Sequence, residues 1–274
     1  MKKIFSIILL VFSVFINAQS PHFLASRSLN EKIDVVATIL QSNGEGRDGD
    51  TSNPNYPFTS SNGYWFDGTT QHDISTDRGG AIEGSYANYL CEEYYSLTGR
   101  KLVEIEEATG GKGLTSTSTT GTNWSDGGGL WEAAKITIDA ALNYYNKNSP
   151  LAIIMIGGER DAITMDDNGA YTKAIVKTAQ QDLIDRIFTD YPDTIIIISE
   201  LGTEGATNTQ GWIDMRAIQN EVATENTNVF IGFNGAIDFD AEGKKIDDYH
   251  NDYTGNQEMG EAIANSLSTN TTDI

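Results

Sequence analysis

The chain has three histidines, which limits where a general base can lie. His250 follows Asp247 by three residues, just ahead of an amphipathic segment near the C-terminus. An imidazole can accept a proton from a hydroxyl group, and a nearby carboxylate can orient the ring and stabilise the imidazolium. His22 lies beside a predicted processing site, and His72 is expected in a polar loop without a strand or helix to hold it. If the protein uses a histidine as a general base, we therefore predict that it is His250, with Asp247 as the carboxylate that orients the ring.

A candidate nucleophile follows the first predicted strand, residues 33–40, in the string Gln41-Ser42-Asn43. A serine at the carboxyl end of a strand can present its hydroxyl group above the sheet edge, while its amide points at a substrate oxyanion. Serine is also common in ordinary turns, because its hydroxyl group bonds to nearby backbone. Ser42 therefore becomes a candidate only together with partners from other strands.

Glycines follow the next two predicted strands. Gly110-Gly111 comes after the second strand, and paired glycines let the backbone approach a ligand and turn an amide towards it. Residues 157–161, Gly-Gly-Glu-Arg-Asp, follow the third strand with two carboxylates and a guanidinium in three residues. A flexible turn is the alternative interpretation of the first segment, and a surface ion pair that of the second.

Short β-branched runs alternate with longer helical runs, which is typical of a parallel sheet with helices on both faces. Each strand candidate is apolar on consecutive residues, as strands covered on both faces tend to be. The expected strands are residues 33–40, 102–105, 151–156, 194–199 and 229–231. The expected helices are residues 86–96, 130–146, 171–188, 212–224 and 257–267. This order predicts an α/β fold, a three-layer α/β/α sandwich around a central, mostly parallel sheet.

Two stretches rich in Gly, Ser, Thr and Asn, residues 45–80 and 110–129, lie close behind predicted strand ends. In an open α/β sheet that edge builds the ligand site, and loops of this length usually shape a pocket. The aromatic side chains of these stretches either stack on a sugar or anchor the loop to the core. They are Tyr56, Phe58, Tyr64, Trp65, Phe66 and Trp124, with Trp131 just beyond. The tail, residues 266–274, is expected to be frayed.

Residues 1–18 are typical of a secretory signal, with two lysines, an apolar run and a small-residue cleavage end. The apolar run is too short to span a bilayer, so we expect a secreted or periplasmic bacterial protein without a membrane partner. Residues 19–274 show no linker or repeat, which favours a single domain. Cys91 falls within a predicted helix, so this single cysteine offers neither a disulfide nor a lipid anchor.

The formal net charge of the 274-residue chain is −21, and loss of the two lysines of the signal makes it more negative. Such a surface repels a phosphate backbone, which disfavours nucleic acid as a partner. Asp48-Gly49-Asp50 lacks the later glutamate of an EF-hand loop, so we expect a solvated turn there and not a calcium site.

The order of these motifs resembles that of SGNH hydrolases, in the branch of carbohydrate esterases with sialate O-acetylesterase-like and acetylxylan esterase proteins. In that branch a Gly-Gln-Ser-Asn motif, often continuing into Gly-Arg, follows the first strand, and a Gly-Gly pair follows the second. A Gln-Gly-Glu-x-Asp motif follows the third strand, an Asp-x-x-His motif precedes the last helix, and another helix carries Trp...Arg-x-x-Gln. The similar residues here are Gln41-Ser42-Asn43 with Gly46-Arg47, Gly110-Gly111, Gly158-Glu159-Arg160-Asp161, Asp247 with His250, and Trp212, Arg216 and Gln219. The resemblance extends from about Lys32 to Leu267.

Two positions depart from the family pattern. Leu40 stands where the first motif begins with Gly, and Gly157 stands where the third begins with Gln. The family's Gln lies where other SGNH enzymes place an oxyanion-hole Asn. Loss of one such donor typically lowers the rate by about a hundredfold to a thousandfold. Asn43 or a residue of the long loops is an alternative donor.

The resemblance implies a secreted esterase that removes O-acetyl groups from a carbohydrate without a metal or other cofactor. Ser42 would be the nucleophile, His250 the base and Asp247 its orienting carboxylate, with the amides of Ser42 and Gly111 as the oxyanion hole. The candidate substrate-binding residues are Gln41, Asn43, Gly110, Gly157 and Glu159. The implied substrate is an O-acetylated glycan of the acetylxylan or sialic acid type, or a small ester.

Two other functions fit the same pattern. The departures at Leu40 and Gly157 fit a carbohydrate-binding relative that has lost turnover. An SGNH lipase or thioesterase would use the same triad with a more apolar pocket, although the polar loops argue against this. The sequence predicts no particular oligomeric state.

Overall fold

The computed structural model describes residues 32–45, 62–75 and 85–271. Contacts divide the chain into Met1–Lys32 and a folded unit, Ile33–Ile274, which contains every element described below. The predicted signal, residues 1–18, lies outside the described residues, so the signal and the single domain of residues 19–274 stay predictions. None of the described helices is both long and apolar enough to cross a membrane.

A seven-stranded sheet forms the centre of the folded unit, in the order β3-β2-β4-β1-β5-β6-β7. The strands are β1 (Ile33–Leu40), β2 (Gly63–Phe66), β3 (Gln71–Asp73), β4 (Lys101–Glu106), β5 (Ala152–Ile156), β6 (Ile195–Ser199) and β7 (Val229–Phe233). All neighbouring pairs are parallel except β2 with β3. The predicted α/β class with a mostly parallel sheet is confirmed.

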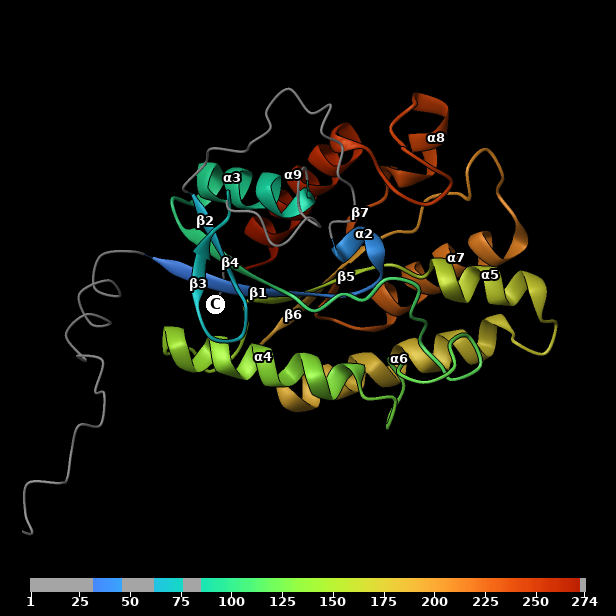
Figure 1. Cartoon of the computed structure of the whole chain (residues 1–274), viewed down its shortest axis with the longest axis horizontal. Coiled ribbons are helices and arrows are strands. Elements are labelled where there is room, and N and C mark those ends of the chain that lie inside the picture. Colours follow the sequence, from blue (N-terminus) through green and yellow to red (C-terminus); the bar gives the residue numbers. More distant parts are fainter. Residues whose placement is uncertain (1–31, 46–61, 76–84, 272–274) are drawn as a thin grey trace, which may run out of the picture. The chain divides into compact units, whose positions relative to one another are not determined.

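Helices cover both faces of this sheet (Figure 1). They are α2 (Ser42–Glu45), α3 (Tyr86–Thr98), α4 (Leu130–Tyr145), α5 (Glu159–Asp167), α6 (Lys173–Asp190), α7 (Gln210–Glu225), the 3₁₀ turn η1 (Gly235–Asp238), α8 (Phe239–Glu242) and α9 (Tyr253–Asn270). Successive side chains of a strand point to opposite faces. In β1, Val35 and Ala37 therefore join the core beneath α4, α6 and α7, while Val36 joins the core beneath α3 and α9.

The five predicted strands are present, but the predicted loop over residues 45–80 is wrong where it is described. Residues 63–73 form the β2–β3 hairpin at the sheet edge, so His72 does lie on a strand. Its ring stacks on Trp65, with ring centroids 4.1 Å apart, and its Nε2 lies 2.8 Å from Asp67 Oδ2. The expected fraying from residue 266 is also wrong, because α9 continues to Asn270. Helix α5 was not predicted.

The described aromatic side chains of the two long stretches serve the core. Trp124 and Trp131 are buried in the core cluster beneath α4 and α6, as is Phe66 of β2. Tyr64 and Trp65 pack against the edges of the two clusters. This arrangement favours anchoring over a sugar-stacking wall, while Tyr56 and Phe58 lie outside the described residues.

Helix α3 carries the single cysteine and packs closely on the sheet. The Ser85 hydroxyl accepts a hydrogen bond from the Ala87 amide at its start, and Gly99 closes its end with a φ of 66°. Cys91 is fully buried, and a Cβ on Gly63 of β2 would lie 2.5 Å from the Cys91 Cβ. Only glycine therefore allows α3 to lie this near the edge strand, and the predicted place of Cys91 within a helix is confirmed.

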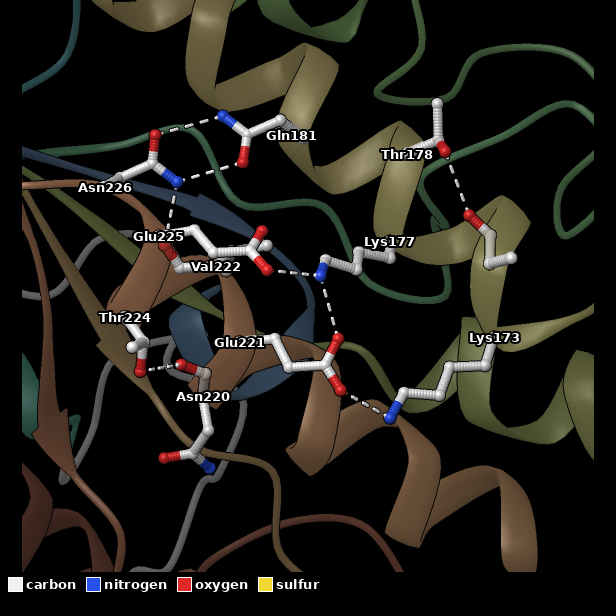
Figure 2. A network of polar contacts seen from close by, with 11 residues as sticks. Lys173, Lys177, Thr178, Gln181, Asn220, Glu221, Val222, Thr224, Glu225 and Asn226 are labelled. Carbon is white, nitrogen blue, oxygen red and sulfur yellow. Dashed lines mark hydrogen bonds and ion pairs between the residues drawn. The ribbon is translucent and has the colours of Figure 1, made fainter.

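Ion pairs join α6 to α7 on the surface (Figure 2). Glu221 lies between Lys173 and Lys177, at 2.7 and 2.9 Å, and Lys177 also contacts Glu225 at 2.7 Å. Exposed ion pairs contribute little to stability on their own. They place two lysines beside two glutamates where α6 and α7 lie side by side, in a chain of strongly negative net charge.

Candidate active site

The structure brings Ser42, His250 and Asp247 together in one line of hydrogen bonds. Ser42 begins α2 directly after β1, and His250 lies in the turn before α9. His250 Nε2 is 2.9 Å from Ser42 Oγ, and His250 Nδ1 is 2.8 Å from Asp247 Oδ2. When Nδ1–H donates to the carboxylate, Nε2 is left as the acceptor for the serine hydroxyl. Two residues 208 positions apart thus lie in hydrogen-bond contact, in the geometry that a nucleophile and its base require.

Asp247 also fixes the backbone of the turn that carries the base. Its Oδ1 accepts hydrogen bonds from the amides of Tyr249 and His250, both at 2.7 Å. Burial acts to raise the pKa of Asp247, but the hydrogen bonds from the His250 ring and from these two amides outweigh it and lower the pKa. The carboxylate is therefore ionised at neutral pH, as an orienting partner of an imidazole requires.

The turn from Lys244 to Asp252 is closed at its base and tied to the loop after β6. The Ile246 amide donates to the His250 carbonyl at 3.0 Å, and the Asp252 amide donates to the Lys244 carbonyl at 2.8 Å. The Tyr249 hydroxyl donates to Glu204 at 2.8 Å. Asp252 then caps α9, accepting from two of its first amides. The histidine is thus held by a closed turn and not by a flexible loop.

The backbone just ahead of Ser42 is strained. Leu40 has a φ of 93°, a region that residues other than glycine rarely adopt. The resemblance places Gly at this position, and the positive φ gives the physical reason for that preference. Such strain typically costs about 1–3 kcal/mol, whereas the buried side chain of a leucine contributes about 2–5 kcal/mol. Leu40 is buried in the core, so its packing offsets the strain.

A pair of variants isolates this strain. We expect Leu40→Gly to be more stable than Leu40→Ala by about 1 kcal/mol, although Gly in a strand is usually less stable than Ala. Both should be less stable than the natural chain, because both lose buried apolar groups. Urea unfolding of the two variants measures the difference, and Ile39→Gly with Ile39→Ala is the matched pair at a buried position without positive φ. If Leu40→Ala were the more stable variant, no strain would be present at Leu40.

Gln41 fills the space beside the second departure, Gly157. Gly157 has a φ of 146°, and a Cβ there would lie 2.8 Å from the Gln41 Cβ and 3.0 Å from the Gln41 amide nitrogen. The Gln41 side chain is buried, and its Oε1 accepts from the Arg160 amide at the start of α5. Gln219 donates to the Gly157 carbonyl at 3.0 Å. These contacts show that Gln41 and Gly157 shape the turns next to Ser42, whereas their predicted contact with substrate stays a prediction.

Two amides remain available for an oxyanion. Within the described part of the chain, the amides of Ser42 and Gly111 donate no hydrogen bond. Gly111 has a φ of 69°, which favours glycine. Its neighbour Gly110 donates to Glu45 Oε2 at 3.1 Å, so the amide of this predicted substrate-binding residue holds the loop against α2. Sequence reasoning missed Glu45, because the contact spans 65 positions and belongs to no motif.

Asp161 braces the loop that carries Gly111. It is fully buried, and it accepts from the Leu114 amide at 3.0 Å and from the Tyr171 hydroxyl at 2.6 Å. Burial raises the pKa of Asp161, while hydrogen bonds from Tyr171, Ser118 and Leu114 oppose that rise. Glu159 is buried too, so the interpretation of residues 159–161 as a surface ion pair is wrong.

The Asn43 side chain is not free to donate to an oxyanion. Its Nδ2 donates to Glu159 and to the Tyr249 carbonyl, both at 3.0 Å, and its Oδ1 accepts from the Asn251 amide at 3.3 Å. Both protons of the amide group are therefore used within the protein. Among the described residues, no three His, Cys, Asp or Glu side chains are arranged to hold a metal ion.

The chain matches no model of a protein family and no curated protein. Solved structures do share its fold. A protein from Arabidopsis thaliana is 16% identical with a TM-score of 0.66, over 87% of this chain and 99% of that one. A carbohydrate acetylesterase from Xanthomonas citri is 14% identical with a TM-score of 0.62, over 88% of this chain and 57% of that one. A putative GDSL-like lipase from Parabacteroides merdae is 15% identical with a TM-score of 0.52, over 88% of this chain and 96% of that one. The resemblance to SGNH and GDSL-like hydrolases is thus confirmed at the level of the fold.

Proposed function

We propose that this protein is a serine esterase that removes O-acetyl groups from a carbohydrate. The observation that carries the proposal is the line of hydrogen bonds from Ser42 through His250 to Asp247. A hydroxyl group, an imidazole and a carboxylate in this order form the arrangement that serine hydrolases use on unrelated folds. The fold shared with a carbohydrate acetylesterase supports a sugar acetate as the substrate. The acetylxylan or sialic acid type of this substrate rests on the resemblance of the sequence motifs. Export to the periplasm or medium is part of the proposal and rests on residues 1–18.

In the proposed mechanism, His250 Nε2 takes the proton of Ser42 as Oγ attacks the acetyl carbonyl carbon. The amides of Ser42 and Gly111 stabilise the oxyanion of the tetrahedral intermediate. His250 then returns its proton to the departing sugar oxygen, which leaves an acetyl group on Ser42. Water, deprotonated by His250, attacks this acetyl-enzyme. The bond from the acetyl carbon to Ser42 Oγ then breaks, His250 returns the proton to Oγ, and acetate is released. Asp247 stabilises the imidazolium in both halves of the reaction.

Nitrophenyl esters of increasing acyl length test this function on the purified protein. We expect the highest kcat/KM for the acetyl ester, together with labelling of Ser42 by a fluorophosphonate. A preference for long acyl chains would favour a lipase or thioesterase. An intact protein that neither hydrolyses the esters nor labels at Ser42 would favour a carbohydrate-binding relative without turnover. Acetate release from acetylated xylan and from O-acetylated sialic acid then separates the two sugar classes.

A further inference from the structure

The side chain next to the nucleophile holds the backbone on both sides of the base. Asn43 donates from Nδ2 to the carbonyl of Tyr249 at 3.0 Å, and its Oδ1 accepts from the amide of Asn251 at 3.3 Å. His250 is the residue between these two contacts. One side chain therefore joins the turn of the nucleophile directly to the turn of the base.

Glu159 in turn holds Asn43. Its Oε1 accepts from Asn43 Nδ2 at 3.0 Å, and Glu159 is only 6% exposed at the first position of α5. Burial raises the pKa of Glu159, against the opposing effects of its own amide and of the Asn43 hydrogen bond. A carboxyl group buried in this way is directed at Asn43 and not at a substrate in solvent.

Glu159 also lines a small cavity. Glu159 Oε2 and Trp212 Nε1 are buried without a hydrogen-bond partner in the described residues, and both side chains line a cavity of about 20 Å³. A cavity of this size holds one water molecule when polar groups surround it. Asn43, Tyr249 and Asn251 line the same cavity, so the whole network borders it.

We propose that Asn43 and Glu159 are positioning residues: Glu159 fixes Asn43, and Asn43 fixes the backbone of His250 relative to Ser42. This inference rests on the proposed function and replaces the expectation that these two residues bind substrate. A displacement of about 1 Å between reacting groups can lower a rate about a hundredfold. Contacts that hold the backbone of His250 in place should therefore affect kcat. Substrate affinity does not depend on them.

Steady-state hydrolysis of p-nitrophenyl acetate by four variants tests whether Glu159 acts on His250 through Asn43. We expect Glu159→Ala and Asn43→Ala each to lower kcat about 10-fold to 100-fold with KM unchanged. Glu159→Gln keeps an acceptor for Asn43 and should recover most of kcat. The double variant should be no slower than Asn43→Ala alone, because Glu159 acts through Asn43. Glu200→Ala is the matched control, since Glu200 lines the same cavity but bonds to Asn220; its kcat should equal that of the natural chain.

A rise in KM at constant kcat would overturn the proposal in favour of substrate binding, and additive losses would overturn the order from Glu159 to Asn43. Hydrogen exchange over residues 249–251 gives a second readout that needs no turnover. Exchange of the Asn251 amide should be faster in Glu159→Ala and Asn43→Ala than in the natural chain. In Glu159→Gln it should return to the rate of the natural chain. If the natural chain did not hydrolyse the ester, the proposed function would fail, but hydrogen exchange would still test whether Asn43 and Glu159 hold the backbone around His250. Unchanged exchange in all variants would refute that positioning role.

Discussion

Ser42→Ala and His250→Ala should each lower kcat for p-nitrophenyl acetate by about 10⁴-fold or more. The first variant removes the atom that would carry the acetyl group, and the second removes the acceptor 2.9 Å from it. Because the two groups act as one unit, the double variant should be no slower than either single variant. Hydrolysis measured on correctly folded protein, judged by unchanged melting temperature, gives the result.

His72→Ala is the control for the histidine variant. His72 also contacts an aspartate, with Nε2 2.8 Å from Asp67 Oδ2, but it lies on the β2–β3 hairpin at the sheet edge. We expect its removal to leave hydrolysis unchanged. Equal losses in His72→Ala and His250→Ala would show that the assay reports stability and not catalysis, and an active His250→Ala would exclude His250 as the base.

The second large effect is expected from Gly157→Gln, which introduces the residue that the related motif carries. We predict lower stability, by about 2–4 kcal/mol, and hydrolysis reduced by about a hundredfold or more, rather than a restored oxyanion donor. The new Cβ would overlap the Gln41 side chain and backbone, and the backbone would keep a φ that side chains disfavour. Displaced Gln41 would shift Ser42, its neighbour. Thermal unfolding and kcat measure the two effects.

Gly169→Gln is the matched control for this substitution. Gly169 is exposed, and a Cβ there would meet nothing within 4 Å. It should change neither melting temperature nor kcat. If Gly157→Gln behaved like this control, or hydrolysed faster than the natural chain, the space beside Gln41 would be adaptable and our account of this departure would be wrong.

The central sheet could be predicted because its strands are buried on both faces. Runs such as Ile195–Ser199 are apolar on consecutive residues and do not alternate between apolar and polar. This pattern distinguishes them from the amphipathic helices between them. The β2–β3 hairpin could not be predicted in the same way. Its strands are short, lie at the sheet edge and are surrounded by Gly, Ser, Thr and Asn, so turn propensity outweighed the signal of Tyr64, Trp65 and Phe66.

The candidate site, too, could be predicted from the sequence only in part. Ser42, Asp247 and His250 could be proposed because their residue types and their places at the sheet edge limit the chemistry. The network behind them could not, since Asn43 and Glu159 meet across 116 positions and only the folded chain brings the start of α5 next to α2. Contacts of that kind carry no periodicity and no local spacing.

Cys91 gives the protein a built-in chemical reporter. As the single cysteine of the chain it lies fully buried on the face of α3 that packs against Gly63 of β2, so a thiol reagent can reach it only after α3 moves away from the sheet. The rate of thiol modification under native conditions therefore measures how often this side of the sheet opens in the intact protein. A cysteine introduced on the surface would react first and alone, which makes site-specific labelling possible without removing Cys91.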